Sequence, residues 1–141
     1  MLAFLATLVV AAAPACPPTR PTAPGPEYVP HAPVRSVVGK GHILYGVVRA
    51  AYSCHPVAHA RIEIWQAGPQ GRYGSAWRAT VFTDRAGHYR FQGPYPGAEA
   101  GRRPHVHLRI SAPGYASLVA QYSPRPNERL GRFDISLLSP P

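Results

Sequence analysis

The chain of 141 residues has few acidic side chains and almost no lysine. It carries 6 Asp and Glu against 15 Lys and Arg, a formal net charge of +9, and Lys40 is its one lysine. The arginines are scattered along the chain rather than clustered, and no nucleic-acid reader motif accompanies them, so we expect no nucleic-acid partner. The Gly-x-Gly patterns lack a following helix, and nucleotide binding is therefore unsupported.

Long helices are not expected, because the 18 prolines and 13 glycines are spread through the chain instead of gathering at the ends of elements. Glycine does not recur at every third residue, which excludes a collagen-like chain. Apolar residues make up 45% and aromatic residues 10% of the chain, which argues against simple disorder. The length suits one domain of ordinary size.

A long hydrophobic run is also missing. The apolar run at residues 2–13 is about a dozen residues long, whereas a membrane-spanning helix needs about 20. The run ends in Ala13-Pro14-Ala15, a small-x-small pattern typical of a cleaved secretory signal, although no basic residue precedes it. We therefore predict a signal peptide at residues 1–15, an exported (secreted or periplasmic) protein and no membrane span. The alternatives are a wrongly chosen start codon and a buried apolar strand.

Cysteine occurs at two positions, Cys16 and Cys54. Cleavage after Ala15 would make Cys16 the first residue, where a lipid anchor is one possibility, although the preceding residues match a lipoprotein box poorly. Two cysteines in an exported chain can also pair with each other. The sequence leaves three fates open for Cys16: lipidation, a disulfide with Cys54, or a free thiol.

Residues 16–36 form a proline-rich segment, with seven prolines between Pro17 and Pro33 and no hydrophobic periodicity. Such a composition favours extended, polyproline-like backbone and cannot build a core by itself. We interpret this segment as a linker that tethers the export signal to a folded domain at residues 37–141.

The folded part is predicted to be all-β. Short β-rich runs alternate with turns that contain Gly, Pro, Asp and Asn, and Asp84-Arg85-Ala86-Gly87 is a turn signal of the hairpin kind. This spacing predicts an antiparallel β-sandwich of about seven to eight short strands. The runs cover residues 42–50, 60–66, 79–83, 87–91, 105–111, 117–122 and 132–138.

The most distinctive local feature is the His-x-His pair of His105 and His107. On a strand, residues two apart emerge on the same face, so both imidazoles would lie within reach of one metal ion. The apolar Val106, Leu108 and Ile110 would then face the core. A pair of histidines on the polar face of a strand is more often a solvated surface, so the pair alone is a weak signal.

Further segments surround the pair in a fixed order. They are Pro-Val-x-x-Ala-x-Ile-Glu-Ile-Trp-Gln-Ala at residues 56–67, Gly-Arg-Tyr at 71–73, Pro-Tyr-Pro at 94–96 and Arg-Pro-His-x-His at 103–107. Together, over about residues 46–122, they make a sequence that resembles the intradiol ring-cleavage dioxygenases, the family of protocatechuate 3,4-dioxygenase and catechol 1,2-dioxygenase.

The resemblance implies an Fe(III) enzyme that cleaves the aromatic ring of catechol-type compounds with O2 and yields muconate-type diacids. Phenolates are hard anionic donors that favour Fe(III), and imidazoles suit iron well. By motif, the resemblance assigns catalytic roles to Arg103 and Gln121. It assigns the metal to four ligands: Tyr73, Tyr95, His105 and His107.

The sequence also departs from the family pattern. Pro104 is followed directly by His105, one residue sooner than in the family, which could change the aim of Arg103. The segment between Tyr73 and Thr83 is short, so iron binding is better supported than efficient catalysis. The alternative function is a non-catalytic β-sandwich binding module without iron, of the transthyretin-like or carboxypeptidase-regulatory-like kind. The sequence assigns no oligomeric state.

Overall fold

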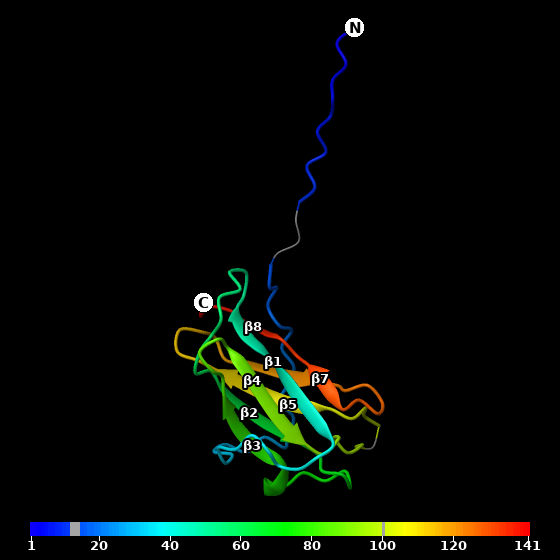
Figure 1. Ribbon diagram of the computed structural model, residues 1–141, viewed down its shortest axis with the longest axis vertical. Coiled ribbons are helices and arrows are strands. Elements are labelled where there is room, and N and C mark those ends of the chain that lie inside the picture. The colour runs from blue at the N-terminus through cyan, green and yellow to red at the C-terminus, as the bar shows by residue number, and fades with distance from the viewer. Residues whose placement is uncertain (12–14, 100) are drawn as a thin grey trace.

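The computed structural model describes residues 1–11, 15–99 and 101–141, and within them the chain is an all-β sandwich, as predicted (Figure 1). Eight strands and one short 3-10 helix follow one another along the described chain. They are β1 (His42–Ala50), β2 (Arg61–Gln66), η1 (Ser75–Trp77), β3 (Arg78–Phe82), β4 (His88–Gly93), β5 (Val106–Ser111), β6 (Leu118–Tyr122), β7 (Leu130–Arg132) and β8 (Ile135–Leu137).

The strands form two four-stranded sheets. One sheet has the order β3-β2-β5-β6 and is antiparallel throughout. In the other, β1 pairs antiparallel with β4 but parallel with both β7 and β8, so the sandwich is not purely antiparallel. The core between the sheets contains Leu108 and Ile110, as the alternation predicted, together with Ile62 and Ile64 of β2, each at most 1% exposed.

The last predicted run, residues 132–138, forms two strands instead of one. The chain leaves regular pairing at Phe133 and Asp134, where the Asp134 carboxylate accepts a hydrogen bond from the backbone N–H of Val47. Tyr89 donates its hydroxyl proton to the carbonyl of Phe133. Side chains thus replace two ladder contacts at this point, and the strand is divided between β7 and β8.

The Asp84–Gly87 turn forms, but it does not join a hairpin. Asp84 accepts hydrogen bonds from the N–H groups of Ala86 and His88, and Gly87 has a φ of +81°. The flanking strands β3 and β4 belong to different sheets, so the turn carries the chain from one layer to the other.

The proline-rich segment at residues 16–36 does not stand away from the sandwich as a tether. The backbone N–H of Thr22 donates a 2.8 Å hydrogen bond to the carbonyl of Val119, and the N–H of Arg35 donates a 3.1 Å hydrogen bond to the carbonyl of Thr80. The Tyr28 hydroxyl donates to Glu63 at 2.7 Å, which helps to bury a polar side chain on the outer face of β2. A segment that cannot form its own core therefore covers one face of the sheet.

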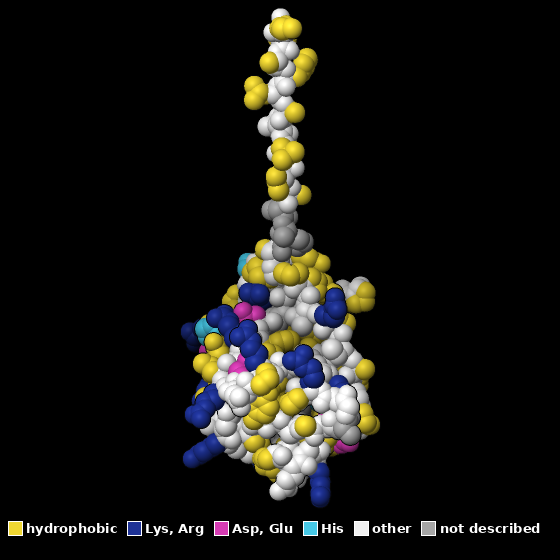
Figure 2. Space-filling model, turned by 90° about the vertical axis from the view of Figure 1, so that its right-hand side faces the viewer, with side chains coloured by type: hydrophobic (Ala, Val, Ile, Leu, Met, Phe, Trp, Pro, Cys, Tyr) yellow, Lys and Arg dark blue, Asp and Glu magenta, His cyan; other side chains and the backbone are white. Residues whose placement is uncertain are grey.

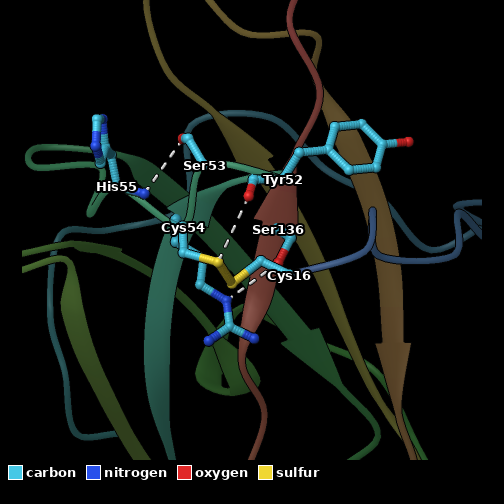
Figure 3. Close-up of a disulfide and its surroundings, with 7 residues drawn as sticks. Cys16, Tyr52, Ser53, Cys54, His55 and Ser136 are labelled. Carbon is cyan, nitrogen blue, oxygen red and sulfur yellow. Dashed lines mark hydrogen bonds between the residues drawn. A yellow bond between two sulfur atoms is a disulfide. The ribbon is translucent and has the colours of Figure 1, made fainter. Parts of the chain in front are cut away.

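A disulfide joins the start of this segment to the loop that follows β1 (Figure 3). Cys16 and Cys54 are bonded across 38 positions of sequence, with their Cα atoms 5.6 Å apart. Of the three fates that the sequence leaves open, the structure contains the disulfide. The bond uses the sulfur that a lipid thioether would need, so the structure gives no support to a lipid anchor on Cys16.

Residues 1–11 extend away from the sandwich (Figure 1). Part of the predicted cleavage pattern, at Ala13 and Pro14, lies outside the described residues, and the signal peptide and the domain boundaries stay predictions. No helix among the described residues is long and apolar enough to cross a membrane. Figure 2 shows Lys and Arg side chains spread over the visible face, several of them close together on its left side, with hydrophobic and acidic groups among them.

Candidate metal centre

The His105 and His107 side chains meet on the outer face of the sheet, opposite the core face of β5. Their Nε2 atoms lie 3.0 Å apart, and the two residues are only 2% and 3% exposed. His107 lies in β5, which is hydrogen-bonded to β2 and β6 on its two sides, and His105 immediately precedes that strand. The predicted same-face arrangement of the pair is therefore present, on an interior strand of the sheet.

Tyr73 brings an oxygen to the two imidazoles. Its hydroxyl lies 3.3 Å from Nε2 of His105 and 3.1 Å from Nε2 of His107, and it also donates a hydrogen bond to a carboxylate oxygen of Glu99. That carboxylate oxygen is 3.3 Å from Nε2 of His105. We call these four residues, Tyr73, Glu99, His105 and His107, the convergent cluster.

Two glycines let the loops that carry Tyr73 and Glu99 pack backbone against backbone. A Cβ atom on Gly97 would lie 2.0 Å from the carbonyl oxygen of Gly68, and one on Gly71 would lie 2.6 Å from that of Ala98. Gly71 also has a φ of +79°, a left-handed conformation that glycine adopts without steric cost. The close approach of the loops places the phenol and the carboxylate beside each other.

Contacts behind the imidazoles fix their orientation. Nδ1 of His105 lies 2.7 Å from the carbonyl oxygen of Arg103, and because a carbonyl only accepts, Nδ1 carries the proton. The lone pair of Nε2 then faces the convergent cluster, as it does in metal-binding histidines. The indole of Trp65 stacks on His107 with ring centroids 5.0 Å apart and planes 5° apart, and Tyr28 from the proline-rich segment packs on the same indole at 5.2 Å.

Burial shifts the pKa of two residues in the convergent cluster, His107 and Tyr73. Burial, with a smaller effect from the neighbouring His105, lowers the pKa of His107 to about 4, so this ring is neutral at neutral pH. Burial and the hydrogen bond to Glu99 raise the pKa of Tyr73, so its phenol stays protonated unless a cation displaces the proton. Two imidazoles, a phenol and a carboxylate form a nitrogen and oxygen donor set that fits iron.

The remaining predicted ligand, Tyr95, is not brought to the convergent cluster. Its hydroxyl donates a 2.8 Å hydrogen bond to the carbonyl of Arg125. Tyr95 lines a cavity of about 610 Å³ together with Arg103 and Arg129. The other residues that line this cavity are Gly41, Pro104, Pro124, Pro126, Asn127 and Glu128. The structure thus brings three of the four predicted ligands together and holds the fourth against a different loop.

The two predicted catalytic residues are also separated. Gln121 lies opposite His107 in the register of β5 and β6, and its side-chain oxygen accepts a 3.1 Å hydrogen bond from Arg102 rather than from Arg103. Arg103 contributes its carbonyl to His105 and its side chain to the cavity beside Tyr95. The missing residue before His105 was the one sign in the sequence that the aim of Arg103 could change.

Glu99 and Arg102 are the residues near the centre that sequence reasoning missed. Glu99 lies in a segment rich in Pro and Gly, without periodicity and six positions before His105, so no local pattern marks it as a ligand. Within the described residues, Glu99, His105 and His107 form a group whose ligand atoms all lie within 4.8 Å of one another. That convergence depends on loop packing, which a strand pattern does not reveal.

The sandwich and its buried histidine pair with oxygen donors define a candidate non-haem metal protein. No protein-family model matches the chain. Among curated proteins, the chain is 31% identical over 93 residues to a catechol 1,2-dioxygenase of Acinetobacter guillouiae, which covers 48% of this chain and 30% of that protein. It is 31% identical over 105 residues to a hydroxyquinol 1,2-dioxygenase of Rhodococcus opacus, and this match covers 57% of this chain and 35% of that protein. The chain spans about a third of the length of these curated relatives.

Solved structures agree with this likeness. The dioxygenase domain of a carbohydrate-binding fusion protein from Streptomyces sp. SirexAA-E superposes with a TM-score of 0.78 at 25% identity, covering 87% of this chain and 99% of that one. An intradiol ring-cleavage dioxygenase from Tetranychus urticae has the same fold, with a TM-score of 0.76 at 17% identity, covering 87% and 95%. The curated proteins and solved structures that the chain is similar to are intradiol ring-cleavage dioxygenases, and the resemblance seen in the sequence is confirmed. The alternative of a binding module without iron is not favoured.

Proposed function

We propose that the protein is an Fe(III)-dependent intradiol dioxygenase that cleaves catechol-type compounds with O2. The single observation that carries this proposal is the convergence of Tyr73, His105 and His107, with the hydroxyl 3.1 to 3.3 Å from both Nε2 atoms. The named activities of the relatives, on catechol and on hydroxyquinol, support an aromatic diol as the substrate class.

The reaction balances without a reductant. The carbon–carbon bond between the two hydroxyl-bearing carbons breaks, and both atoms of O2 enter the product, a muconate-type diacid. When bound, the iron supplies the Lewis acid and redox chemistry that lets a catecholate react with O2. The two imidazoles and the Tyr73 phenolate are the groups that would hold it, and a cation at this point would take the place of the Tyr73 proton.

Other residues would position the substrate and exclude water. The Arg102 guanidinium donates a 3.1 Å hydrogen bond to Gln121, the residue opposite His107 in the β5–β6 register, and would stabilise negative charge on a bound catecholate. Gln121 would fix the position of that guanidinium. Trp65 is 2% exposed and stacks on His107, so it would keep the back of the ring dry and its angle fixed.

The experiment combines metal analysis with oxygen uptake. Purified protein is loaded with iron, and O2 consumption is followed with catechol, protocatechuate and hydroxyquinol. We expect about one iron per chain, uptake of one O2 per diol and a diacid product. His107→Ala should lose iron and activity, whereas His88→Ala, at an exposed histidine on β4, should keep both. A protein that binds no iron and consumes no O2 with any of the three diols would overturn the proposal.

We further propose that the protein is exported. The Cys16–Cys54 disulfide supports this location, because such bonds persist in oxidising compartments and are rare in the cytosol. The test is the mass of the protein recovered from cells that express the full chain. We expect a mature chain that begins at Cys16, outside the cytosol, and an uncleaved chain with free thiols in the cytosol would contradict the proposal.

A further inference from the structure

Tyr95 is held away from the convergent cluster by several contacts at once. Its hydroxyl donates to the carbonyl of Arg125 at 2.8 Å and lies 3.4 Å from that of Pro124. Its ring meets His42 edge-on, with centroids 6.1 Å apart and planes at 90°. Moving this side chain to the histidine pair would break these contacts and leave the carbonyl of Arg125 without this donor.

Glu99 already occupies the place beside the histidines. Its carboxylate accepts a hydrogen bond from the Tyr73 hydroxyl and lies 3.3 Å from Nε2 of His105, with the side chain 25% exposed. The turn that carries it is closed by a backbone hydrogen bond from Arg102 to the carbonyl of Glu99, at 3.1 Å. A carboxylate held beside a phenol and two imidazoles has the acceptor character that a cation would use.

The other acidic side chains of the chain are engaged elsewhere. Within the described residues their ion-pair partners are arginines in three cases and histidines outside the convergent cluster in two. The pairs are Glu27 with Arg78, Glu63 with Arg109, Asp134 with Arg132, Asp84 with His88, and Glu128 with His42. Glu99 is the acidic residue whose carboxylate faces His105 and Tyr73 instead of an arginine, in a chain that carries 14 of them.

We propose that Glu99, and not Tyr95, is the fourth protein ligand, so that this chain holds its iron with one tyrosine, one glutamate and two histidines. The inference rests on the proposed function for the identity of the metal. Glutamate and tyrosinate carry the same charge, so the exchange leaves the net charge of the donor set unchanged. It does change the electronic structure, because a carboxylate does not give the visible charge-transfer absorption that a phenolate bound to Fe(III) gives.

The test compares four variants by iron content and visible absorption, with folding checked by circular dichroism. Tyr73→Phe should abolish the visible band, since Tyr73 would be the one phenolate ligand, and Tyr95→Phe should keep both the band and the iron. Glu99→Gln should weaken iron binding by more than the roughly 10- to 100-fold typical of losing an outer hydrogen-bonding partner. Glu99→Asp, which keeps a carboxylate, should retain part of that affinity.

The matched control for Glu99→Gln is Glu27→Gln, which removes the same charge from a half-exposed side chain with only a 3.9 Å contact to Arg78. This control should bind iron as the parent does. If Tyr95→Phe loses the band or the iron while Glu99→Gln keeps both, the inference is overturned and the proposed function stands. If the parent protein binds no iron and cleaves no diol, the proposed function fails and the inference fails with it.

Discussion

Removing the Cys16–Cys54 disulfide should cost the protein a large part of its stability. The bond joins residues 38 positions apart, and the loop-entropy relation for a closed loop of that size gives about 4 kcal/mol at 25 °C. A domain of this size typically has only about 5–15 kcal/mol in total. The double variant Cys16→Ser/Cys54→Ser should therefore unfold at clearly lower denaturant, with a midpoint temperature lower by roughly 15 °C.

The single variants make the test sharper. Cys16→Ser and Cys54→Ser each open the same loop, so each should be about as unstable as the double variant, and their effects should not add. The assay is equilibrium urea unfolding followed by tryptophan fluorescence, with thiol titration of the unfolded parent to confirm the bond. Ser53→Ala, next to Cys54, is the control and should change the free energy of unfolding by less than about 0.5 kcal/mol. A double variant within about 1 kcal/mol of the parent would refute this reasoning, because the loop constraint alone predicts several times that.

Two further predictions concern contacts around the candidate centre, and a third concerns the contacts of Glu128 with His42 and Tyr122. Gly97→Ala puts a Cβ 2.0 Å from a backbone oxygen, so it should destabilise the fold by about 1–3 kcal/mol and weaken iron binding. In the control Gly74→Ala the Cβ meets nothing within 4 Å, so neither stability nor iron binding should change. Equal unfolding midpoints and equal iron content in the two variants would contradict the argument that Gly97 lets the loops pack closely. Arg102→Ala should lower kcat/KM for catechol about 10- to 100-fold and more than Arg103→Ala does, and steady-state oxygen uptake showing the reverse order would return the role to Arg103. Burial raises the pKa of Glu128, but the hydrogen bonds from His42 and Tyr122 outweigh this effect and lower that pKa overall. The stabilisation that Glu128 contributes is therefore present at neutral pH and is lost as the pH falls through the lowered pKa. In Glu128→Gln, the free energy of unfolding measured in urea should fall less steeply with acid than in the parent, and an unchanged slope would exclude this role.

The strands could be predicted from the sequence because their signal is local. Alternation placed Val106 and Leu108 toward the core and His105 and His107 away from it, and the structure has this arrangement. The division of the last strand was not predictable, since it depends on the Asp134 side chain meeting the backbone of a strand that lies 87 positions earlier.

The donors of the candidate centre also divide into those that the sequence predicted and one that it did not. Two of its donors, His107 in β5 and His105 just before that strand, follow from a two-residue spacing. Tyr73 was found through its motif, because the Gly-Arg-Tyr segment is distinctive even though it lies in a loop. Glu99 was missed, because its proximity to the histidines arises from two loops meeting at Gly71 and Gly97, a contact that no periodicity records.

The proline-rich segment was expected to be a tether, and its packing corrects that view. Prolines lower the entropy of the unfolded chain and favour extended backbone, so such a segment loses little freedom when it lies along a sheet. The Tyr28 hydroxyl then reaches Glu63 and the ring reaches Trp65. Because Trp65 stacks on His107, the segment is connected to the candidate centre through two aromatic contacts.

Two of the metal donors depend on a strand and the other two stand on loops, and this difference has an evolutionary consequence. The histidines are tied to β5 and its approach, where a one-residue shift would turn each side chain into the core. Tyr73 and Glu99 stand on loops, which tolerate insertions and exchanges that a sheet does not. Related sandwiches can therefore be expected to keep the imidazole pair while trading their oxygen donors between positions, so that one scaffold can hold metal centres of different colour and reactivity.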